Sequence, residues 1–427
     1  MAELRNAVIV GSNRVPFGKV GGAYAAATNI DLLTAAIDGL VARFGLAGER
    51  LGEVGAGAVL KHSRDFNLTR EAVLSSALSN TTPAYDVGQA CATSLTAAVQ
   101  LSNRIRVGQL DVAIAGGVDS ASDSPVAVSD RLRRALIRLN AAKPPLDKAK
   151  TLATVRPADL APEVPRAAER RTGLNMGQHQ ALTTAQWGIT RQAQDELAAA
   201  SHHNLAAAWD AGFFDDLVTP YLGLTRDQSL RPDTSVEKLA KLRPVFGDGP
   251  DASMTAGNST PLSDGAATVL LAEEGWARAR NLPVLARIVD AETAAVDYVL
   301  GGEGLLMAPV HATARLLARN GLALQDFDFY EIHEAFASTV LCALAAWESD
   351  DYCRDVLGLD AALGSIDRAK LNVHGSSLAA GHPFAATGAR ILGTLAKMLA
   401  DKGPGSRGLI SVCAAGGQGL VAIVEAC

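Results

Sequence analysis

The stretch Asp111-Val-Ala-Ile-Ala-Gly-Gly117 has a counterpart near the end of the chain, Ile410-Ser-Val-Cys-Ala-Ala-Gly-Gly417. Each is an apolar, strand-like run that ends in Ala-Gly-Gly, where missing side chains let backbone segments approach closely. Such runs, among them residues 7–10, alternate with longer Ala/Leu segments of helical period, which predicts βα units in a mainly parallel sheet. The similarity between these two runs is compatible with a duplication, although glycine after a strand is common in α/β folds.

Composition narrows the class of protein. A chain of 427 residues with 48% hydrophobic and 20% charged residues predicts a globular α/β protein of two or three packed units. A net charge of −6 argues against a nucleic-acid binder, because phosphate-backbone binding favours a basic domain. The five cysteines are widely spaced without a CxxC pair, so we expect free thiols in a reducing compartment. With no export-type leader and no long apolar run in the sequence, we expect a cytoplasmic protein.

Residues 129–250 differ in composition from the rest of the chain. They are rich in Arg, Lys, Pro and Gln and lack strong strand patterns, which predicts an inserted, mostly helical lobe. A basic stretch in this segment fits equally a solvated helical face and a binding surface. Such a surface would contact coenzyme phosphates, a partner subunit or anionic lipid. The members of the basic stretch are Arg131, Arg133, Arg134, Arg138, Lys143, Lys148 and Lys150.

Cys91 lies in Gln89-Ala-Cys-Ala-Thr-Ser94, between the extended residues 83–87 and a segment with the apolar spacing of a helix. We therefore expect a strand, a turn and a helix N-terminus. The positive end of a helix dipole lowers the pKa of a thiol from about 8.5 and increases its thiolate fraction. The alternative is a cysteine buried as a small apolar side chain.

Two histidines occupy comparable positions. His382 stands in a glycine-bounded loop before Pro383 and a predicted helix, where an imidazole can act as a base near neutral pH. His333 follows the apolar run 327–332 and precedes a helix that we expect to begin at residues 335–337. Ligands bind at strand ends of this kind in open α/β sheets. A capped loop without catalytic function is the alternative for His382.

Cys413 follows another predicted strand and precedes Ala414-Ala-Gly-Gly-Gln-Gly419, a loop that is either a plain glycine turn or an oxyanion-binding set of amides. Two cysteines and two histidines on separate βα units form an acyl-transfer constellation of nucleophile, base, oxyanion donor and second proton carrier. A metal site is the rival prediction. The residues lack the close i, i+3 or i+4 pairing typical of zinc ligands, so we expect no metal.

With these residues in place, the sequence closely resembles the thiolase family over essentially the whole chain. The landmarks that carry the resemblance are residues 89–94, 254–265 (MTAGNSTPLSDG), 333–337 (HEAFA), 372–390 and 413–419. The resemblance implies two similar halves, each a five-stranded sheet with helices on both faces, packed as α/β/α/β/α layers with a mostly helical loop domain inserted in the first. The implied domains are an N-terminal half (residues 1–128 and 251–283), a CoA-binding loop domain (129–250) and a C-terminal half (284–427).

The resemblance also implies a role for individual residues. Cys91 carries the acyl group, His382 activates it, and Cys413 exchanges the α-proton of the second substrate. The backbone amides of Cys91 and Ala415 stabilise the thioester oxyanion, and His382 and His333 face the enolate oxygen. The positions that match coenzyme A contacts are Met176, Arg231, Ala256, Thr260 and Phe336.

Three departures from the family pattern refine the activity. Many thiolases have Asn at position 333, and the His-Glu-Ala-Phe form looks like the branch of the trifunctional-protein β subunit, which acts in fatty-acid β-oxidation. Asn175 replaces a histidine and Thr260 a serine of many biosynthetic thiolases. We therefore predict a 3-ketoacyl-CoA thiolase that cleaves its substrate with CoA through an acyl-Cys91 intermediate.

Three alternatives remain beside this prediction. They are an acetoacetyl-CoA-forming acetyl-CoA acetyltransferase, a ketoacyl synthase, and a non-catalytic acyl-CoA-binding subunit. Cys413 opposes the synthase, which would have His or Asn in its place. CoA and acyl-CoA are expected as substrates, with no cofactor. The resemblance implies a homodimer or homotetramer and leaves open a β-oxidation partner subunit and membrane contact.

Overall fold

One continuous β-sheet runs through the computed structural model, which describes residues 4–163, 165, 168–249 and 251–427. A bridge between Ile9 and Ala286 joins its two half-sheets at β1 and β11. The strands of the first half-sheet are, from edge to centre, β4 (Ala84–Asp86), β3 (Glu53–Ala56), β5 (Val112–Ser120), β10 (Ser263–Glu273) and β1 (Ala7–Arg14). The short strand β2 (Gly18–Lys19) also pairs with β10. The second consists, from centre to edge, of β11 (Ala286–Ala295), β14 (Gln418–Ala426), β13 (Arg407–Ala414) and β12 (Phe329–Ile332).

Helices cover both faces of each half-sheet: α1 (Asn29–Phe44), α2 (Leu68–Ser75), α3 (Thr93–Arg106), α10 (Ala308–Asn320), α11 (Ala337–Glu348) and α14 (Thr387–Lys402). Alternate residues of β1 point to opposite faces, as a strand requires. Val8 and Val10 pack beneath α1 and α2, whereas Ile9 joins a buried cluster with α3 and α14. That cluster also contains Val412 and Val424 of the second half-sheet, so α3 and α14 form a shared inner layer. With α10 and α11 on the far side, the layers follow the predicted α/β/α/β/α order.

The two half-sheets repeat one topology, which confirms the predicted duplication. In each, a helix precedes an inner strand (α3 before β5, α14 before β13), and that strand pairs antiparallel with one neighbour and parallel with the other. The expectation of a mainly parallel sheet is wrong. Antiparallel pairs occupy the centre, from β5 with β10 to β14 with β13, and of these pairs β13 and β14 are joined by a tight turn rather than by a crossover helix.

Two further expectations need correction. Gly116 and Gly117 lie inside β5 rather than after it, and a Cβ atom on Gly117 would lie 2.0 Å from the carbonyl oxygen of Ala385. Among the described residues, the fifth strand implied for the second half is reduced to a single parallel bridge between Tyr330 and Leu371. A short irregular segment therefore takes the place that β4 fills in the first half.

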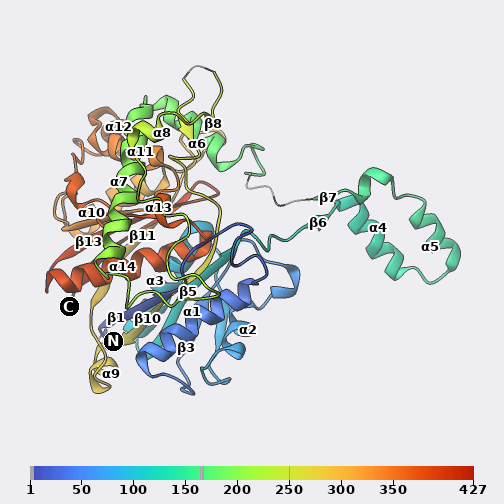
Figure 1. Ribbon diagram of the computed structural model, residues 1–427, viewed down its shortest axis with the longest axis horizontal. Helices are drawn as coiled ribbons and strands as arrows, with labels where there is room; N and C mark the ends of the chain where they lie inside the picture. Colours follow the sequence, from blue (N-terminus) through green and yellow to red (C-terminus); the bar gives the residue numbers. More distant parts are fainter. Residues whose placement is uncertain (1–3, 164, 166–167, 250) are drawn as a thin grey trace.

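The segment between β5 and β10 is mostly helical, as predicted for the insert. In Figure 1, α4 and α5 project away from the layered body on the chain segments that carry β6 and β7. The elements of this segment are β6 (Ala127–Val128), α4 (Asp130–Ala141), α5 (Pro145–Leu152), β7 (Pro162–Glu163), α6 (Met176–Gln186), α7 (Arg191–Asp210), α8 (Val236–Leu239), β8 (Pro244–Phe246) and β9 (Met254–Thr255). The remaining α-helices are α9 (Glu274–Ala279), α12 (Asp350–Asp355) and α13 (Ser377–Ala380).

Acidic neighbours pair with part of the basic stretch on α4. Asp130 at the start of the helix pairs with both Arg133 and Arg134, and Asp159 pairs with Arg131 at 3.2 Å. These are exposed pairs on a solvated helix face. Across the part of the chain that the structure describes, every helix is too short or too polar to cross a membrane.

Candidate active site

The backbone turns sharply just before Cys91. Ala90 has a φ of 46°, in the left-handed region that residues other than glycine seldom adopt. It begins the 3₁₀ turn η2 (Ala90–Ala92), which connects the loop after β4 to α3. The Thr93 hydroxyl donates to the carbonyl oxygen of Ala90 at 2.7 Å and accepts from the N–H of Gln89 at 2.9 Å. The predicted strand, turn and helix are confirmed, and this turn holds Cys91 at the N-terminus of α3.

The expected lowering of the thiol pKa is wrong. Desolvation raises the pKa of Cys91 to about 12, with a further contribution from the charge of Asp119. The backbone N–H groups of Ala415 and of Cys91 itself act in the opposite direction but do not compensate. The sequence showed the helix N-terminus beside the sulfur, but not the protein that surrounds it. Cys91 therefore rests as a neutral thiol.

His382 meets this thiol from the other half of the chain. Its Nε2 atom lies 3.1 Å from Sγ of Cys91, and its Nδ1 atom lies 2.6 Å from the hydroxyl of Thr387. The ring follows Gly381, whose φ of 102° suits glycine, and precedes the 3₁₀ turn η5 (Phe384–Ala386). Burial, followed by the charge of Arg390, lowers the pKa of His382 to about 3. The imidazole is thus neutral near pH 7 and can accept a proton from the thiol.

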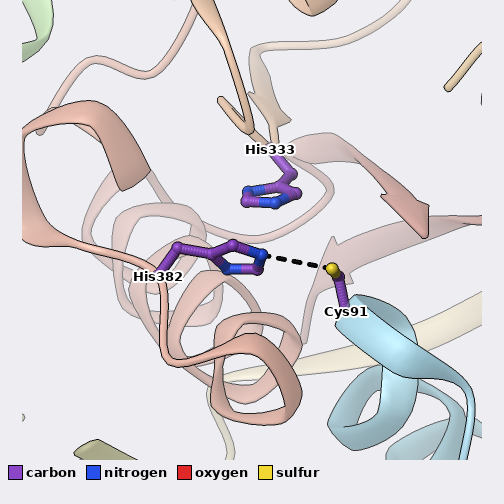
Figure 2. A group of neighbouring side chains, drawn as sticks. All are labelled: Cys91, His333 and His382. Atoms are coloured by element: carbon purple, nitrogen blue, oxygen red, sulfur yellow. Dashed lines mark hydrogen bonds between the residues drawn. The ribbon is translucent and has the colours of Figure 1, made fainter. Parts of the chain in front are cut away.

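His333 lies against His382 at the end of β12. Figure 2 shows the two imidazoles beside the sulfur of Cys91, and their ring centroids are 4.2 Å apart. The Nδ1 atom of His333 is 2.8 Å from the hydroxyl of Ser377, while its buried Nε2 atom has no hydrogen-bond partner among the described residues. Burial first, then the charges of His382 and Arg390, hold the pKa of His333 well below its usual value. A neutral imidazole with one unused nitrogen therefore borders the thiol.

Cys413 reaches the same place at the end of β13. This strand contacts η2, which carries Cys91, and the charge of Cys91 adds to burial in raising the pKa of the Cys413 thiol. Ala415 begins the turn between β13 and β14, and the N–H of Gly416 donates to Glu169 at 2.6 Å. The loop thus brings a second thiol and a backbone N–H group to Cys91. Its glycines fit the turn, with φ values of 82° at Gly416 and 69° at Gly417.

The residues expected to contact coenzyme A are only partly brought together. Met176 and Phe336 share an apolar cluster with Cys413, and the Thr260 hydroxyl donates to the backbone oxygen of Ser377 at 2.9 Å. Ala256 is exposed two residues after Met254 of that cluster. Arg231 is also exposed, and no hydrogen bond among the described residues connects it with this group.

The three groups around the sulfur also have the chemistry of metal ligands. The donor atoms of Cys91, His333 and His382 all lie within 4.8 Å of one another. One thiolate and two imidazoles are ligands that zinc accepts. The argument from sequence spacing does not exclude such a site, because each ligand comes from a different βα unit. The contact between His382 and Cys91 equally fits a base beside its nucleophile.

A buried carboxylate orders the surroundings of His333. Glu334 accepts from the hydroxyl of Ser201 at 2.7 Å, from the side-chain amide of Asn372 at 2.8 Å and from the N–H of Leu378 at 3.1 Å. Asn372 has a φ of 46°, which asparagine tolerates better than most residues. These bonds tie α7 and the segment before α13 to the end of β12. They thereby anchor the segment that leads into the His382 loop.

Supporting residues were missed in the sequence. Asp119, Thr387, Ser377 and Arg390 support the site through hydrogen bonds and charge, but only Asp119 lies near a strand end. The segment 372–390 carried part of the signal, because it groups several hydroxyl residues and a buried arginine near His382. Their partners come from distant elements and were not visible in the sequence.

Comparison with known proteins agrees with this geometry. The N-terminal domain model of thiolase matches residues 7–275 and the C-terminal domain model matches residues 282–426. Proteins named 3-ketoacyl-CoA thiolase from Yersinia pestis and Yersinia pseudotuberculosis are 40% identical over 424 residues, which cover 98% of this chain and 96% of theirs.

Solved structures give the same result. The Bacillus anthracis acetyl-CoA acetyltransferase superposes with a TM-score of 0.82 at 29% identity, and both chains are covered completely. Human mitochondrial 3-ketoacyl-CoA thiolase superposes with a TM-score of 0.80 at 28% identity, again over the whole of both chains. A structure of the human enzyme in complex with CoA matches with the same score and identity, covering 100% of this chain and 99% of that one. With both domain models matched and relatives aligned along nearly its full length, the chain belongs to the thiolase family.

Proposed function

We propose that this protein is a 3-ketoacyl-CoA thiolase, which uses coenzyme A to cleave 3-ketoacyl-CoA into acetyl-CoA and a shortened acyl-CoA. The observation that carries the proposal is the 3.1 Å contact between Nε2 of His382 and Sγ of Cys91, with Cys413 beside them. The curated relatives share the name of this activity. Coenzyme A and acyl-CoA are substrates here, and the chemistry requires no metal or redox cofactor.

In the first half-reaction, His382 takes the proton of the Cys91 thiol as the sulfur attacks the 3-keto carbon. The N–H groups of Cys91 and Ala415 stabilise the resulting oxyanion. The carbon–carbon bond then breaks, the acyl group stays on Cys91, and the other fragment leaves as the enolate of acetyl-CoA. Cys413 supplies the proton that converts this enolate into acetyl-CoA.

In the second half-reaction, the thiol of coenzyme A attacks the acyl-Cys91 thioester. A thioester exchange of this kind needs a base for the attacking thiol and a proton for the leaving thiolate. Cys413, left as a thiolate by the first half-reaction, takes the proton of coenzyme A, and the protonated His382 returns its proton to the leaving Cys91 sulfur, which restores all three groups. The raised pKa of Cys91 is compatible with its proposed role as nucleophile. The thiol gives its proton to His382 only when the substrate carbonyl is in place, and a thiolate of higher pKa is the stronger nucleophile. The reverse Claisen condensation uses the same groups.

His333 gives the proposal its preference for 3-ketoacyl substrates of β-oxidation over a strictly biosynthetic role. Its Nε2 atom has no hydrogen-bond partner among the described residues, and we propose that it faces the enolate oxygen during the reaction. Met176 and Phe336, in the apolar cluster with Cys413, are proposed to line the pantetheine and the reactive end of the coenzyme. Ala256, Thr260 and Arg231 complete the proposed contacts. Residues 129–250 are the proposed CoA-binding loop domain, inserted in the N-terminal half (residues 1–128 and 251–283), and residues 284–427 are the C-terminal half.

The assembly and location of the protein belong to the same proposal. We expect a cytoplasmic homodimer or homotetramer that acts in fatty-acid β-oxidation, and the proposal leaves open a partner subunit. The projecting helices α4 and α5 carry the basic stretch and are available for such contacts (Figure 1).

A thiolysis assay tests the activity. Loss of the 3-ketoacyl-CoA chromophore is followed with coenzyme A across a series of chain lengths, for the wild type, for Cys91→Ala and for Cys427→Ala as a control at an exposed cysteine. We expect turnover by the wild type and the control and a loss of at least ~10³-fold in Cys91→Ala. Turnover of malonyl thioesters alone would favour a ketoacyl synthase. Coenzyme A binding without turnover by the wild type would favour a non-catalytic subunit, and cleavage confined to acetoacetyl-CoA would favour an acetyl-CoA acetyltransferase.

A further inference from the structure

The hydrogen-bond partners of His333 determine which of its nitrogens carries the proton. Arg390 donates from Nη2 to the hydroxyl oxygens of Ser377 at 2.8 Å and of Ser376 at 3.1 Å. Ser377 in turn lies 2.8 Å from Nδ1 of His333. All four residues are buried, with at most 5% of each exposed. A buried proton without a partner is costly, so the arrangement that leaves the fewest polar atoms of this chain unpaired is favoured.

A guanidinium only donates, so the Ser377 oxygen must accept from Arg390. The hydroxyl proton of Ser377 then points elsewhere, and within the described residues the Nδ1 atom of His333 is the remaining partner of this hydroxyl. If Nδ1 carried the proton instead, the Ser377 hydroxyl would be buried without an acceptor, which is costly. Nδ1 is thus the acceptor, and in a neutral ring the proton sits on Nε2.

We propose that Ser377 and Arg390 are positioning residues that hold His333 as the neutral Nε2–H tautomer, so that the ring offers a fixed N–H donor to the enolate oxygen. This inference rests on the proposed thiolase function for its catalytic consequence, but not for the tautomer itself. A ring nitrogen of His333 lies within 4.8 Å of donor atoms of Cys91 and His382. Because Nδ1 is engaged by Ser377, Nε2 is the nitrogen left for the enolate oxygen of that reaction.

A neutral N–H donor suits this position. It stabilises a developing negative charge without becoming a second acid beside His382, so the proton that completes acetyl-CoA comes from Cys413. The Arg390 guanidinium, which sets the tautomer, makes no direct hydrogen bond with His333. Arg390 lies on α14, and its hydrogen bonds reach His333 through the Ser377 hydroxyl.

Ser376 provides a matched control. Both serines are fully buried and both accept from the same Nη2 atom, but only Ser377 contacts His333. Replacing either by alanine removes one acceptor of Arg390. Only Ser377→Ala also removes the group that keeps Nδ1 an acceptor, so only this variant frees His333 to exchange tautomers.

The test is ¹⁵N NMR of the imidazole nitrogens in full-length protein labelled at histidine, combined with steady-state thiolysis. The His333 signals are assigned by their loss in His333→Gln. We expect a protonated Nε2 and an unprotonated Nδ1 in the wild type and in Ser376→Ala, and a mixture in Ser377→Ala. We expect kcat to fall ~10-fold or more in Ser377→Ala, to change less than ~3-fold in Ser376→Ala, and to recover in Ser377→Thr, which restores the hydroxyl.

A wild-type protein with the proton on Nδ1 of His333 would overturn the proposal without any variant. Equal losses of kcat in the two alanine variants, or an unchanged tautomer in Ser377→Ala, would also overturn it. An Nε2–H tautomer in a protein without thiolysis would instead refute the proposed function and leave the assignment of the tautomer intact.

Discussion

A carboxylate oxygen of Asp119, at the end of β5, accepts a hydrogen bond of 2.8 Å from the backbone N–H of Ala385 in the turn that follows His382. The same carboxylate accepts from the N–H groups of Val59 and Leu60 at 2.7 to 3.1 Å. One buried side chain of the first half therefore fixes the loop of the second half that carries His382. The geometry of the Cys91–His382 pair depends on this connection between halves.

Asp119→Asn tests that connection. The amide places an NH₂ group against backbone N–H donors, so at least one of them loses its acceptor. We expect the free energy of unfolding to fall by about 2–3 kcal/mol. Urea denaturation measures the change, with Asp111→Asn as a control in an exposed pair with Arg5 that costs less than about 1 kcal/mol. Equal costs in the two variants would show that Asp119 does not hold the loop.

Gly117→Ala tests the close approach between β5 and the same loop. A Cβ atom would lie 2.0 Å from the carbonyl oxygen of Ala385, and a backbone contact of this kind cannot be relieved by a side-chain rotation. We expect a loss of about 3 kcal/mol in the free energy of unfolding, near the upper end of overpacking costs. Gly88→Ala is the control, because a Cβ there meets open space. A melting temperature for Gly117→Ala that matches the control would contradict the packing described here.

The protonation state of the nucleophile gives a pH prediction. The pKa of Cys91 is raised to about 12 and that of His382 is lowered to about 3, so a neutral thiol and a neutral imidazole coexist between those values. Below its pKa, the thiolate fraction of Cys91 increases about tenfold per pH unit. The rate of alkylation of Cys91 by iodoacetamide, read by peptide mass spectrometry, should therefore rise continuously from about pH 6 to about pH 9. A plateau in this range would indicate a preformed thiolate–imidazolium pair.

The sequence predicted the chemistry of the site better than its electrostatics. Cys91, His333 and Cys413 were recognisable because each follows a predicted strand, and His382 because it stands in a glycine-bounded loop before a predicted helix. The structure gathers donor atoms of Cys91, His333 and His382 within 4.8 Å of one another. The direction of the Cys91 pKa shift was predicted wrongly, since desolvation and the charge of Asp119 arise from distant parts of the chain.

Tertiary packing also explains what the fold prediction lacked. The layers and the duplication were predicted, but the antiparallel centre of the sheet was not. The three-residue turn between β13 and β14 gives only a weak signal in a sequence dominated by repeated βα patterns. The network of Ser377 and Arg390 behind His333 joins α13, α14 and β12. No spacing in the sequence brings those elements together. The domain boundaries and the coenzyme contacts remain predictions.

The acyl-carrying role of Cys91 is tested most directly by trapping the intermediate. The protein is incubated with acetyl-CoA in the absence of another acceptor, digested at low pH, and its peptides are mapped by mass spectrometry. The proposed mechanism predicts one acetyl group on the peptide that contains Cys91 in the wild type and in Cys413→Ala, and none on it in Cys91→Ala. An acetyl group on Cys413 in the wild type, or labelling that persists undiminished in Cys91→Ala, would contradict it.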